Sequence, residues 1–397
     1  MITIFNKIAV LADIANLVTK VALEKIIKVP APARLGDVPA CAEAITPEWL
    51  TLVMCADYPG AKVETVRAYG GSNGTSQRRA LVVTYNDAGK KAGLPEKLFT
   101  KVASSLGSRI VLGLSGAVAG ESLFYNHIRG KLNLRSPKAY YAAFDKKALR
   151  TIAILSDLSD EGYTFPEPMT NPVTRKDAED MVEQMAMYHG AMWNSPMLEN
   201  ELRELKNCYD VQEALNDKVG FIPCVVKGCE RSRVVLPDSV YQRRHDIGPA
   251  LMKALALNLE GPQTLLHQDV HPGNWLRDKD GRMGLYDWQV VTKGGWALDY
   301  SYAMTLILST ENRRAWEKDL LALYLEKLAE NGVATPPTFE RAWHLYCQQI
   351  FHGAVYALFT IGRSALMPKM QPDDYSLWAI QRVGQAIEDL ESFNKVL

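Results

Sequence analysis

The pattern of apolar and polar residues divides the chain into a part that predicts strands and a part that predicts helices. Three runs between residues 63 and 103 are short and rich in β-branched and aromatic residues, which is typical of strands. The glycine-rich "GGSNGTS" and the turn-rich "NDAGKKAGLPE" separate them, so we expect three antiparallel strands. Helical spacing follows at residues 115–132, and "LRTIAILSDLSD" at 149–160 predicts one further strand.

Beyond residue 163 nearly every long segment has helical spacing. Helices are predicted at residues 176–195, 247–260, 314–332 and 339–367. We therefore expect an α+β, bilobal fold with a small antiparallel β-rich lobe and a larger, mostly α-helical lobe. The expected domains are an N-terminal helical extension and linker (1–44), an N-lobe (45–158) that opens with the helix-start pattern "TPEWL", and a C-lobe (159–397).

The first 28 residues carry six charges that break them into short apolar runs, so neither a membrane-spanning helix nor a signal peptide is expected. On a helix these charges share an arc of about 140°, which leaves a broad apolar face. We expect this face to pack on the protein's own body, with a partner subunit or a membrane surface as the alternatives.

The composition argues against several classes of partner and site. Lys plus Arg and Asp plus Glu both number 45 among 397 residues, so no net charge favours a nucleic-acid partner. The six cysteines form no Cys-x-x-Cys pair and no zinc-finger spacing, which indicates reduced thiols. We expect a cytoplasmic protein without a transmembrane segment.

One stretch, "HQDVHPGNW", concentrates chemically active residues. Asp269 and Asn274 lie in it, and the apolar run that ends at Tyr286 delivers Asp287 to the end of a strand. If the three converge, they offer oxygen ligands of the type that Mg²⁺ takes alongside substrate phosphates. Asp269 could also accept a proton from a substrate hydroxyl.

The first lobe offers complementary groups for phosphoryl transfer. Backbone N–H groups of the glycine-rich loop, at Gly71, Ser72, Asn73 and Gly74, could close over phosphate oxygens. Lys101 ends the third predicted strand and could place an ammonium at the phosphates, while Glu121 on the next helix could hold it by an ion pair.

The order of these features resembles the protein-kinase-like fold, because a glycine loop, strand lysine, helix glutamate, H-x-D-x-x-x-x-N and D-x-x follow one another. More narrowly, "HQDVHPGNW", "YDWQ" and "ALDYSYA" resemble the aminoglycoside phosphotransferase and choline kinase-like superfamily. "TPEWL", "ESLFY", "ILSDLS" and "MAMYHGAMW" resemble its ecdysteroid-kinase-like branch. The resemblance covers roughly residues 45–365. Gln289 stands where the superfamily more commonly has glutamate, and "GGSNGTS" is not a G-x-G-x-x-G loop.

The resemblance implies a kinase that uses ATP and Mg²⁺ to phosphorylate a small-molecule alcohol. Asp269 would be the catalytic base, and Asn274 and Asp287 would be the metal ligands. Lys101 would contact the phosphates, with Glu121 positioning it, and Asp299 would brace the catalytic loop. The resemblance further implies that His267 and His271 shape the catalytic loop. It also implies that adenine binds at the hinge, residues 154–158, where Ile154 and Ser156 are the expected adenine-binding residues.

Two other readings stay open. A nucleotide-binding pseudokinase would keep these motifs without turnover, and His267, Asp269 and His271 would share one face of a strand as in a metal-dependent hydrolase. GTP is not distinguished from ATP. The resemblance places the acceptor site in residues 200–260 and 335–370, where an aromatic stripe (Trp343, Tyr346, Phe351, Tyr356 and Phe359) is interpreted as core, or alternatively as a cage for a quaternary ammonium or a wall for a lipid-like alcohol. His127 and His189 are expected to be packed core histidines.

Overall fold

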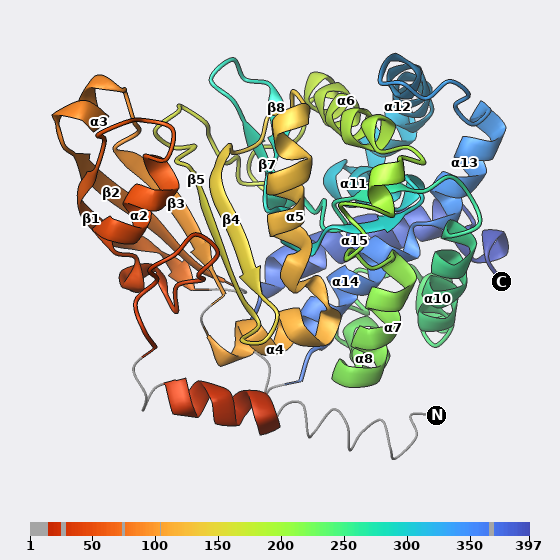
Figure 1. The fold of residues 1–397 in the computed structure, drawn as a ribbon. Coiled ribbons are helices and arrows are strands. Elements are labelled where there is room, and N and C mark those ends of the chain that lie inside the picture. The colour runs from red at the N-terminus through yellow and green to blue at the C-terminus, as the bar shows by residue number, and fades with distance from the viewer. Residues whose placement is uncertain (1–14, 25–28, 74–75, 104, 365–368) are drawn as a thin grey trace. The chain divides into compact units, whose positions relative to one another are not determined.

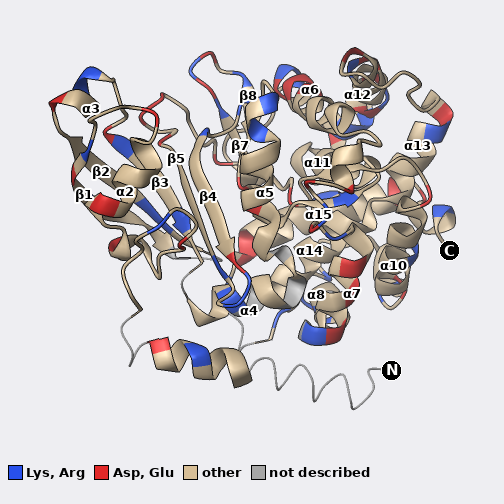
Figure 2. Cartoon of the chain, viewed as in Figure 1, with Lys and Arg blue, Asp and Glu red and all other residues tan. Residues whose placement is uncertain are grey.

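A computed structural model describes the chain except for residues 1–14, 25–28, 74–75, 104 and 365–368. The chain forms two compact units (Figure 1), Met1–Asn133 with Pro137–Tyr163, and Leu134–Ser136 with Thr164–Leu397. The short segment 134–136 thus belongs to the second unit although its flanking residues belong to the first. The domain limits expected after residues 44 and 158 stay predictions. Lysine and arginine are interspersed with aspartate and glutamate in both units (Figure 2).

An antiparallel five-stranded sheet forms the centre of the first unit, with strand order β1-β2-β3-β5-β4. The strands are β1 (Val63–Asn73), β2 (Gln77–Tyr85), β3 (Lys97–Val102), β4 (Ala139–Asp145) and β5 (Arg150–Ser156). Four of them match the predicted strands. The sequence did not reveal β4, because this edge strand buries only Ala142 and has no alternating apolar face.

Helices of the first unit complete its core. They are α2 (Pro47–Met54), α3 (Asp87–Lys91), α4 (Leu106–Ser115) and α5 (Gly120–His127). The helix start predicted from "TPEWL" is confirmed, since Thr46 caps α2 and its hydroxyl accepts a hydrogen bond from the N–H of Trp49 at 3.2 Å. Trp49 and Leu50 are fully buried in one cluster with sheet residues such as Leu81 and Val83. His127 is only half-buried, contrary to the prediction, because it is the last residue of α5.

The second unit is mostly helical. Its helices are α6 (Arg175–Ala191), α7 (Cys208–Val219), α8 (Phe221–Arg231), α9 (Asp238–Gln242), α10 (Ile247–Asn258), α11 (Ala297–Ile307), α12 (Thr310–Glu330), α13 (Phe339–Gln348), α14 (Phe351–Gly362) and α15 (Asp373–Asp389). The single helix predicted at 339–367 is therefore two helices, α13 and α14. Every residue of α11 is buried, which makes it the central helix of this unit.

Two small antiparallel sheets stand among these helices. One pairs β6 (Thr264–Leu266) with β9 (Thr292–Gly294), and the other pairs β7 (Trp275–Arg277) with β8 (Met283–Leu285). The loop from β6 to β7 carries "HQDVHPGN", and the loop from β8 to β9 carries Asp287. A β-rich unit and a larger helical unit confirm the predicted fold class. Among the described residues, no helix combines the length and the apolar character needed to cross a membrane.

Candidate active site

In the first unit, the structure brings Lys101 and Glu121 together. The Nζ atom of Lys101 lies 2.6 Å from Oε1 of Glu121, and each side chain is only 6 % exposed. Lys101 stands on β3 between Arg78 of β2 and Ala153 of β5, while Glu121 is in the first turn of α5. Each partner of an ion pair this well buried compensates the charge that burial removes from water, so losing either one is costly.

The first part of the glycine-rich segment belongs to a strand and not to an open loop. Residues 70–73 continue β1, and Ser72 and Asn73 pair with Arg78 and Gln77 after a bulge that begins at Tyr69. Gly71 has φ +78°, and a Cβ there would lie 1.9 Å from the carbonyl oxygen of Arg78, so the bulge requires glycine. Gly74, a predicted phosphate-binding residue, lies outside the described residues.

The expected adenine-binding residues lie on β5. Ile154 is fully buried and pairs with Thr100 of β3 and Tyr141 of β4. The N–H of Ser156 donates to the carbonyl oxygen of Lys138 at 2.9 Å, and its hydroxyl accepts from the N–H of Lys138 at 3.2 Å. The N–H and the hydroxyl oxygen of Ser156 are therefore both engaged by the backbone of Lys138, the residue before β4.

In the second unit, Asp299 organises the loop that follows β6. Its carboxylate accepts hydrogen bonds from the N–H of His267 at 2.7 Å, the N–H of Gln268 at 2.9 Å and the hydroxyl of Tyr188 at 2.7 Å. Gln268 has φ +67°, a left-handed conformation that a non-glycine residue adopts only when its surroundings impose it. Asp299 thus holds the backbone immediately before Asp269, which is the bracing role that the resemblance implied.

The charge of Asp299 is stabilised inside the protein. Burial would raise the pKa of Asp299, but the neighbouring His189 and the hydroxyl of Tyr188 bring the pKa below its ordinary value. His189 is fully buried, as predicted, with Nε2 3.4 Å from Oδ2 of Asp299 and Nδ1 2.7 Å from the hydroxyl of Tyr324. Burial lowers the pKa of His189, so we take the imidazole as neutral at pH 7 and Asp299 as ionised.

Asp269 differs from Asp299 because 34 % of its side chain is exposed. Its Oδ2 accepts a hydrogen bond from Nδ2 of Asn274 at 3.2 Å, and its Oδ1 accepts a longer one from the hydroxyl of Tyr302 at 3.5 Å. The same Asn274 amide donates to the carbonyl oxygen of Asp269 at 2.8 Å. The two side chains that donate hydrogen bonds to the carboxylate are therefore neutral, Nε2 of His271 lies 3.8 Å from Oδ2, and the carboxylate remains partly accessible to solvent.

Both histidines of the motif support the loop. His267 is buried, its Nδ1 accepts from the N–H of Asp269 at 3.3 Å, and its Nε2 therefore carries the proton that binds the carbonyl oxygen of Tyr286 at 2.9 Å. Burial lowers the pKa of His267, which keeps the ring neutral. Nδ1 of His271 accepts from the N–H of Gly273 at 3.0 Å. These bonds shape the loop and leave His267 without a free nitrogen for a metal.

Hydrogen bonds join the loop that carries Asp287 to the loop that carries Asn274. The N–H of Tyr286 donates to the carbonyl oxygen of Asn274 at 3.0 Å, and its hydroxyl donates to the carbonyl oxygen of Gly273 at 2.7 Å. Asp287 follows directly, with φ +65°. Asn274, Asp269 and Asp287 are thus on two connected loops, and a second left-handed non-glycine residue marks the site.

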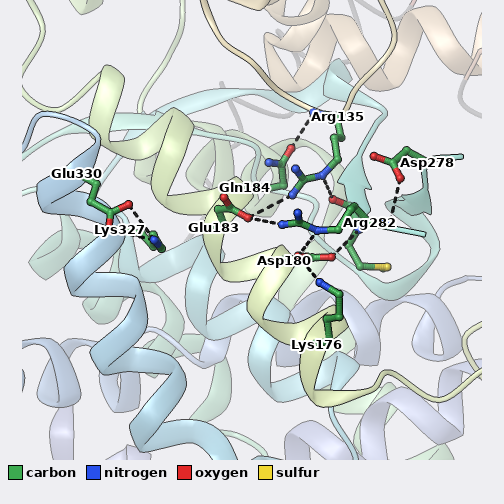
Figure 3. Close-up of polar contacts among 10 residues, drawn as sticks. Arg135, Lys176, Asp180, Glu183, Gln184, Asp278, Arg282, Lys327 and Glu330 are labelled. Carbon is green, nitrogen blue, oxygen red and sulfur yellow. Dashed lines mark hydrogen bonds and ion pairs between the residues drawn. The ribbon is translucent and has the colours of Figure 1, made fainter. Parts of the chain in front are cut away.

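A charged framework that sequence reasoning missed anchors the strand before Asp287. Arg282 donates to Asp180 at 2.6 Å and to Glu183 at 2.8 Å, both on α6 (Figure 3). Nε of Arg135 donates to the carbonyl oxygen of Met283 at 2.6 Å (Figure 3), and the carbonyl oxygen of Arg135 accepts from the N–H of Leu285. Segment 134–136 therefore lies along β8.

Within that segment, the hydroxyl of Ser136 accepts from Nε1 of Trp288 at 2.9 Å, so the segment also holds the residue after Asp287. These contacts join residues 99 or more positions apart, and a local sequence pattern carries no sign of them.

The donor set fits magnesium better than zinc. Asn274 turns its amide nitrogen toward Asp269, so its oxygen faces elsewhere. With the Asp287 carboxylate, that oxygen could supply hard ligands of the type that Mg²⁺ uses together with phosphates. Over the part of the chain that the structure describes, no three His, Cys, Asp or Glu side chains gather as a metal site. The hydrolase reading, with a metal held by His267, Asp269 and His271, finds no support in this geometry.

The aromatic stripe proposed for the acceptor is largely core. Tyr346 and Phe351 are fully buried and Phe359 nearly so. The Tyr346 hydroxyl donates to Glu317 at 2.9 Å. Tyr356 and Trp343 are half-buried.

Comparison with known proteins agrees with the motifs. Residues 158–341 match the model of the phosphotransferase enzyme family, and this segment contains Asp269, Asn274, Asp287 and Asp299. No curated protein matches the chain.

Solved structures that resemble the chain include choline kinase LicA from Streptococcus pneumoniae, with 13 % identity, coverage of 86 % of this chain and 98 % of that one, and a TM-score of 0.44. A putative aminoglycoside phosphotransferase from Ralstonia eutropha JMP134 has 13 % identity, coverage of 86 % and 97 %, and a TM-score of 0.48. The comparison therefore shows that residues 158–341, which include the motifs "HQDVHPGNW", "YDWQ" and "ALDYSYA", are similar to the phosphotransferase enzyme family.

Proposed function

We propose that this protein is an ATP- and Mg²⁺-dependent phosphotransferase that acts on a hydroxyl group of a small molecule. The observation that carries the proposal is the Asp269 carboxylate, which is partly exposed, oriented by Asn274 and Tyr302, and located in the segment that matches a phosphotransferase family. A general base needs this combination, because it must reach the substrate proton and be held in place while it does so.

In the proposed reaction, the substrate hydroxyl gives its proton to Asp269 as its oxygen forms a bond to the γ-phosphorus of ATP. The bond from that phosphorus to the bridging oxygen breaks, and ADP leaves with the electron pair. Asn274 and Asp287 would hold Mg²⁺, which when bound neutralises charge on the phosphate oxygens. In the first unit, Lys101 would bind nucleotide phosphates, with Glu121 holding its ammonium in place. Gly71, Ser72 and Asn73 are proposed to contribute backbone groups, and Ile154 and Ser156 to border the adenine.

The test compares Asp269→Asn with wild type in an acceptor screen of small-molecule alcohols, with ATP and GTP assayed in parallel. We expect turnover to fall by about 10²–10⁴-fold, the usual contribution of a general base, while ATP affinity stays near wild type. Asp280→Asn serves as the control, because Asp280 is an exposed carboxylate whose loss removes the same charge. Wild-type turnover by Asp269→Asn would refute the assigned role.

A binding measurement separates an active kinase from a pseudokinase. Titrating ATP with Mg²⁺ should raise the melting temperature of wild type, because the ligand binds only folded protein, and Asp287→Asn should remove the Mg²⁺-dependent part. A shift without turnover on any acceptor would favour the pseudokinase. The absence of a shift with either nucleotide would contradict the proposal.

A further inference from the structure

The N-terminal extension contacts the first unit through one face of a helix. Residues 15–24 are helical (Figure 1), and Leu17, Val21 and Glu24 follow one another at the spacing of a single helix face. Leu17 is buried and Val21 and Glu24 are half-buried, whereas Val18 and Leu23 on the other side are 41 % and 48 % exposed. The face that ends in Glu24 is therefore the one that docks.

Glu24 binds two buried arginines. Its Oε2 lies 2.6 Å from Nη1 of Arg109, and its Oε1 lies 3.1 Å from Nη2 of Arg109 and 3.2 Å from Nη2 of Arg150. The arginine side chains are 1 % and 11 % exposed. A guanidinium that is this deeply buried needs an anionic partner, because desolvation without one costs several kcal/mol. Glu24 supplies that charge in a bidentate geometry with Arg109.

The two arginines stand on the segments that flank Lys101 and Glu121. Arg109 is in α4, which joins the strand of Lys101 to the helix of Glu121. Arg150 begins β5, which pairs with β3 so that Ala153 lies opposite Lys101. The carboxylate of Glu24 therefore cross-links α4 to β5.

Further contacts fix α4 at the same position. Nε of Arg109 donates to the carbonyl oxygen of Ala148 at 2.7 Å, just before β5. A Cβ added to Gly113 of α4 would lie 2.4 Å from Cδ1 of Leu149, so this side of α4 already packs closely on the chain that enters β5. Arg109 and Gly113 thus both fix α4 against the residues that lead into β5.

We propose that Glu24 is a positioning residue for the Lys101–Glu121 pair, and that the helix of residues 15–24 holds α4 in position. Without Glu24, two buried cations lose their partner, α4 separates from β5, and α5 no longer presents Glu121 to Lys101 at 2.6 Å. The inference rests on the proposed role of Lys101 in nucleotide binding. It assigns a task to an extension that the phosphotransferase chemistry itself does not use.

The test uses the full chain and the variant Glu24→Gln, which keeps the shape of the side chain and removes its charge. Glu43→Gln is the matched control, because Glu43 also pairs with an arginine of this unit, Arg79 at 3.3 Å, but is 52 % exposed. Two readouts are measured: hydrogen–deuterium exchange over residues 106–127, and the affinity for ATP with Mg²⁺. Glu24→Asp, which retains the charge, gives the conservative rescue.

We expect Glu24→Gln to speed amide exchange in α4 and α5 and to weaken ATP binding by roughly 5–150-fold, the usual range for coupled sites. Glu24→Asp should recover part of both, and Glu43→Gln should change neither. Unchanged exchange in Glu24→Gln, or faster exchange with unchanged ATP affinity, would overturn the inference. If wild type itself binds no nucleotide, the proposed function fails, whereas the exchange data still report whether Glu24 holds α4. Should Glu24→Gln not fold, Leu17→Ala loosens the same helix without unpairing a charge and must change both readouts in the same direction.

Discussion

The Lys101 region of the first unit and the Asp269 region of the second hold their acidic groups by opposite means. In the first unit a full ion pair is buried, and the arginines around Glu24 repeat that device. In the second unit, Asp269 is partly exposed and its side chain is oriented by the neutral groups of Asn274 and Tyr302. A residue whose charge is constant can be locked by an opposite charge, whereas a base that gains and loses a proton is better held by donors whose own charge does not change.

The largest expected effect comes from breaking the buried pair. Glu121→Leu should lower the free energy of unfolding by about 3–5 kcal/mol, because it removes the carboxylate that compensates the charge of the buried Lys101 ammonium. The double variant Lys101→Met with Glu121→Leu should recover most of this loss, since apolar groups of similar volume often replace a buried pair at little cost. Urea unfolding of the single and double variants measures the difference. Equal, additive losses would show that the two side chains are not coupled.

A smaller loss of stability for each residue involved is expected at acid pH, and it should be found mainly in the second unit. Burial lowers the pKa of His189, His267 and His352, so these rings stay neutral in the folded state below the ordinary histidine value of about 6.5. As the pH falls below that value, the unfolded chain binds protons that the folded chain rejects. Stability must therefore decrease, by up to about 1.4 kcal/mol per pH unit for each histidine, until the lowered pKa values are reached.

Urea midpoints at pH 7.5 and 5.5 test this expectation. His352→Gln should reduce the slope, because its amide can still donate to the carbonyl oxygen of Gln268, as Nε2 of His352 does at 3.0 Å, but does not titrate. The Lys101 pair involves no histidine, so probes in the first unit should show a weaker dependence over this range. A flat profile for the second unit would mean that these rings are charged or accessible in the folded state.

Sequence reasoning succeeded where a feature is local in the chain. Asp269 and Asn274 are five positions apart, and the strands that carry "VETVRAY" and "KLFTKVA" are marked by their composition. It failed where position depends on distant partners. The role of Tyr302 beside Asp269, the support of Trp288 by Ser136, and the contact of Glu24 with Arg109 all join segments that are 33 or more residues apart. The helix α11 was not predicted for another reason. A helix that is buried on every side has no polar face, so its sequence shows no helical period.

The smallest expected effect concerns the longer of the two hydrogen bonds to Asp269. Tyr302→Phe removes a donor to Oδ1 at 3.5 Å and nothing else of comparable size, so stability should change by no more than about 1 kcal/mol. The carboxylate is then oriented by one side-chain donor instead of two, and kcat/KM should fall by less than about tenfold. Tyr300→Phe on the same helix is the control: Tyr300 is equally buried, and its hydroxyl has no hydrogen-bond partner among the described residues. Equal kcat/KM values for Tyr302→Phe and Tyr300→Phe would show that Asn274 alone orients the carboxylate, and that only one of the two neutral donors contrasted with the buried ion pair of the first unit acts on Asp269.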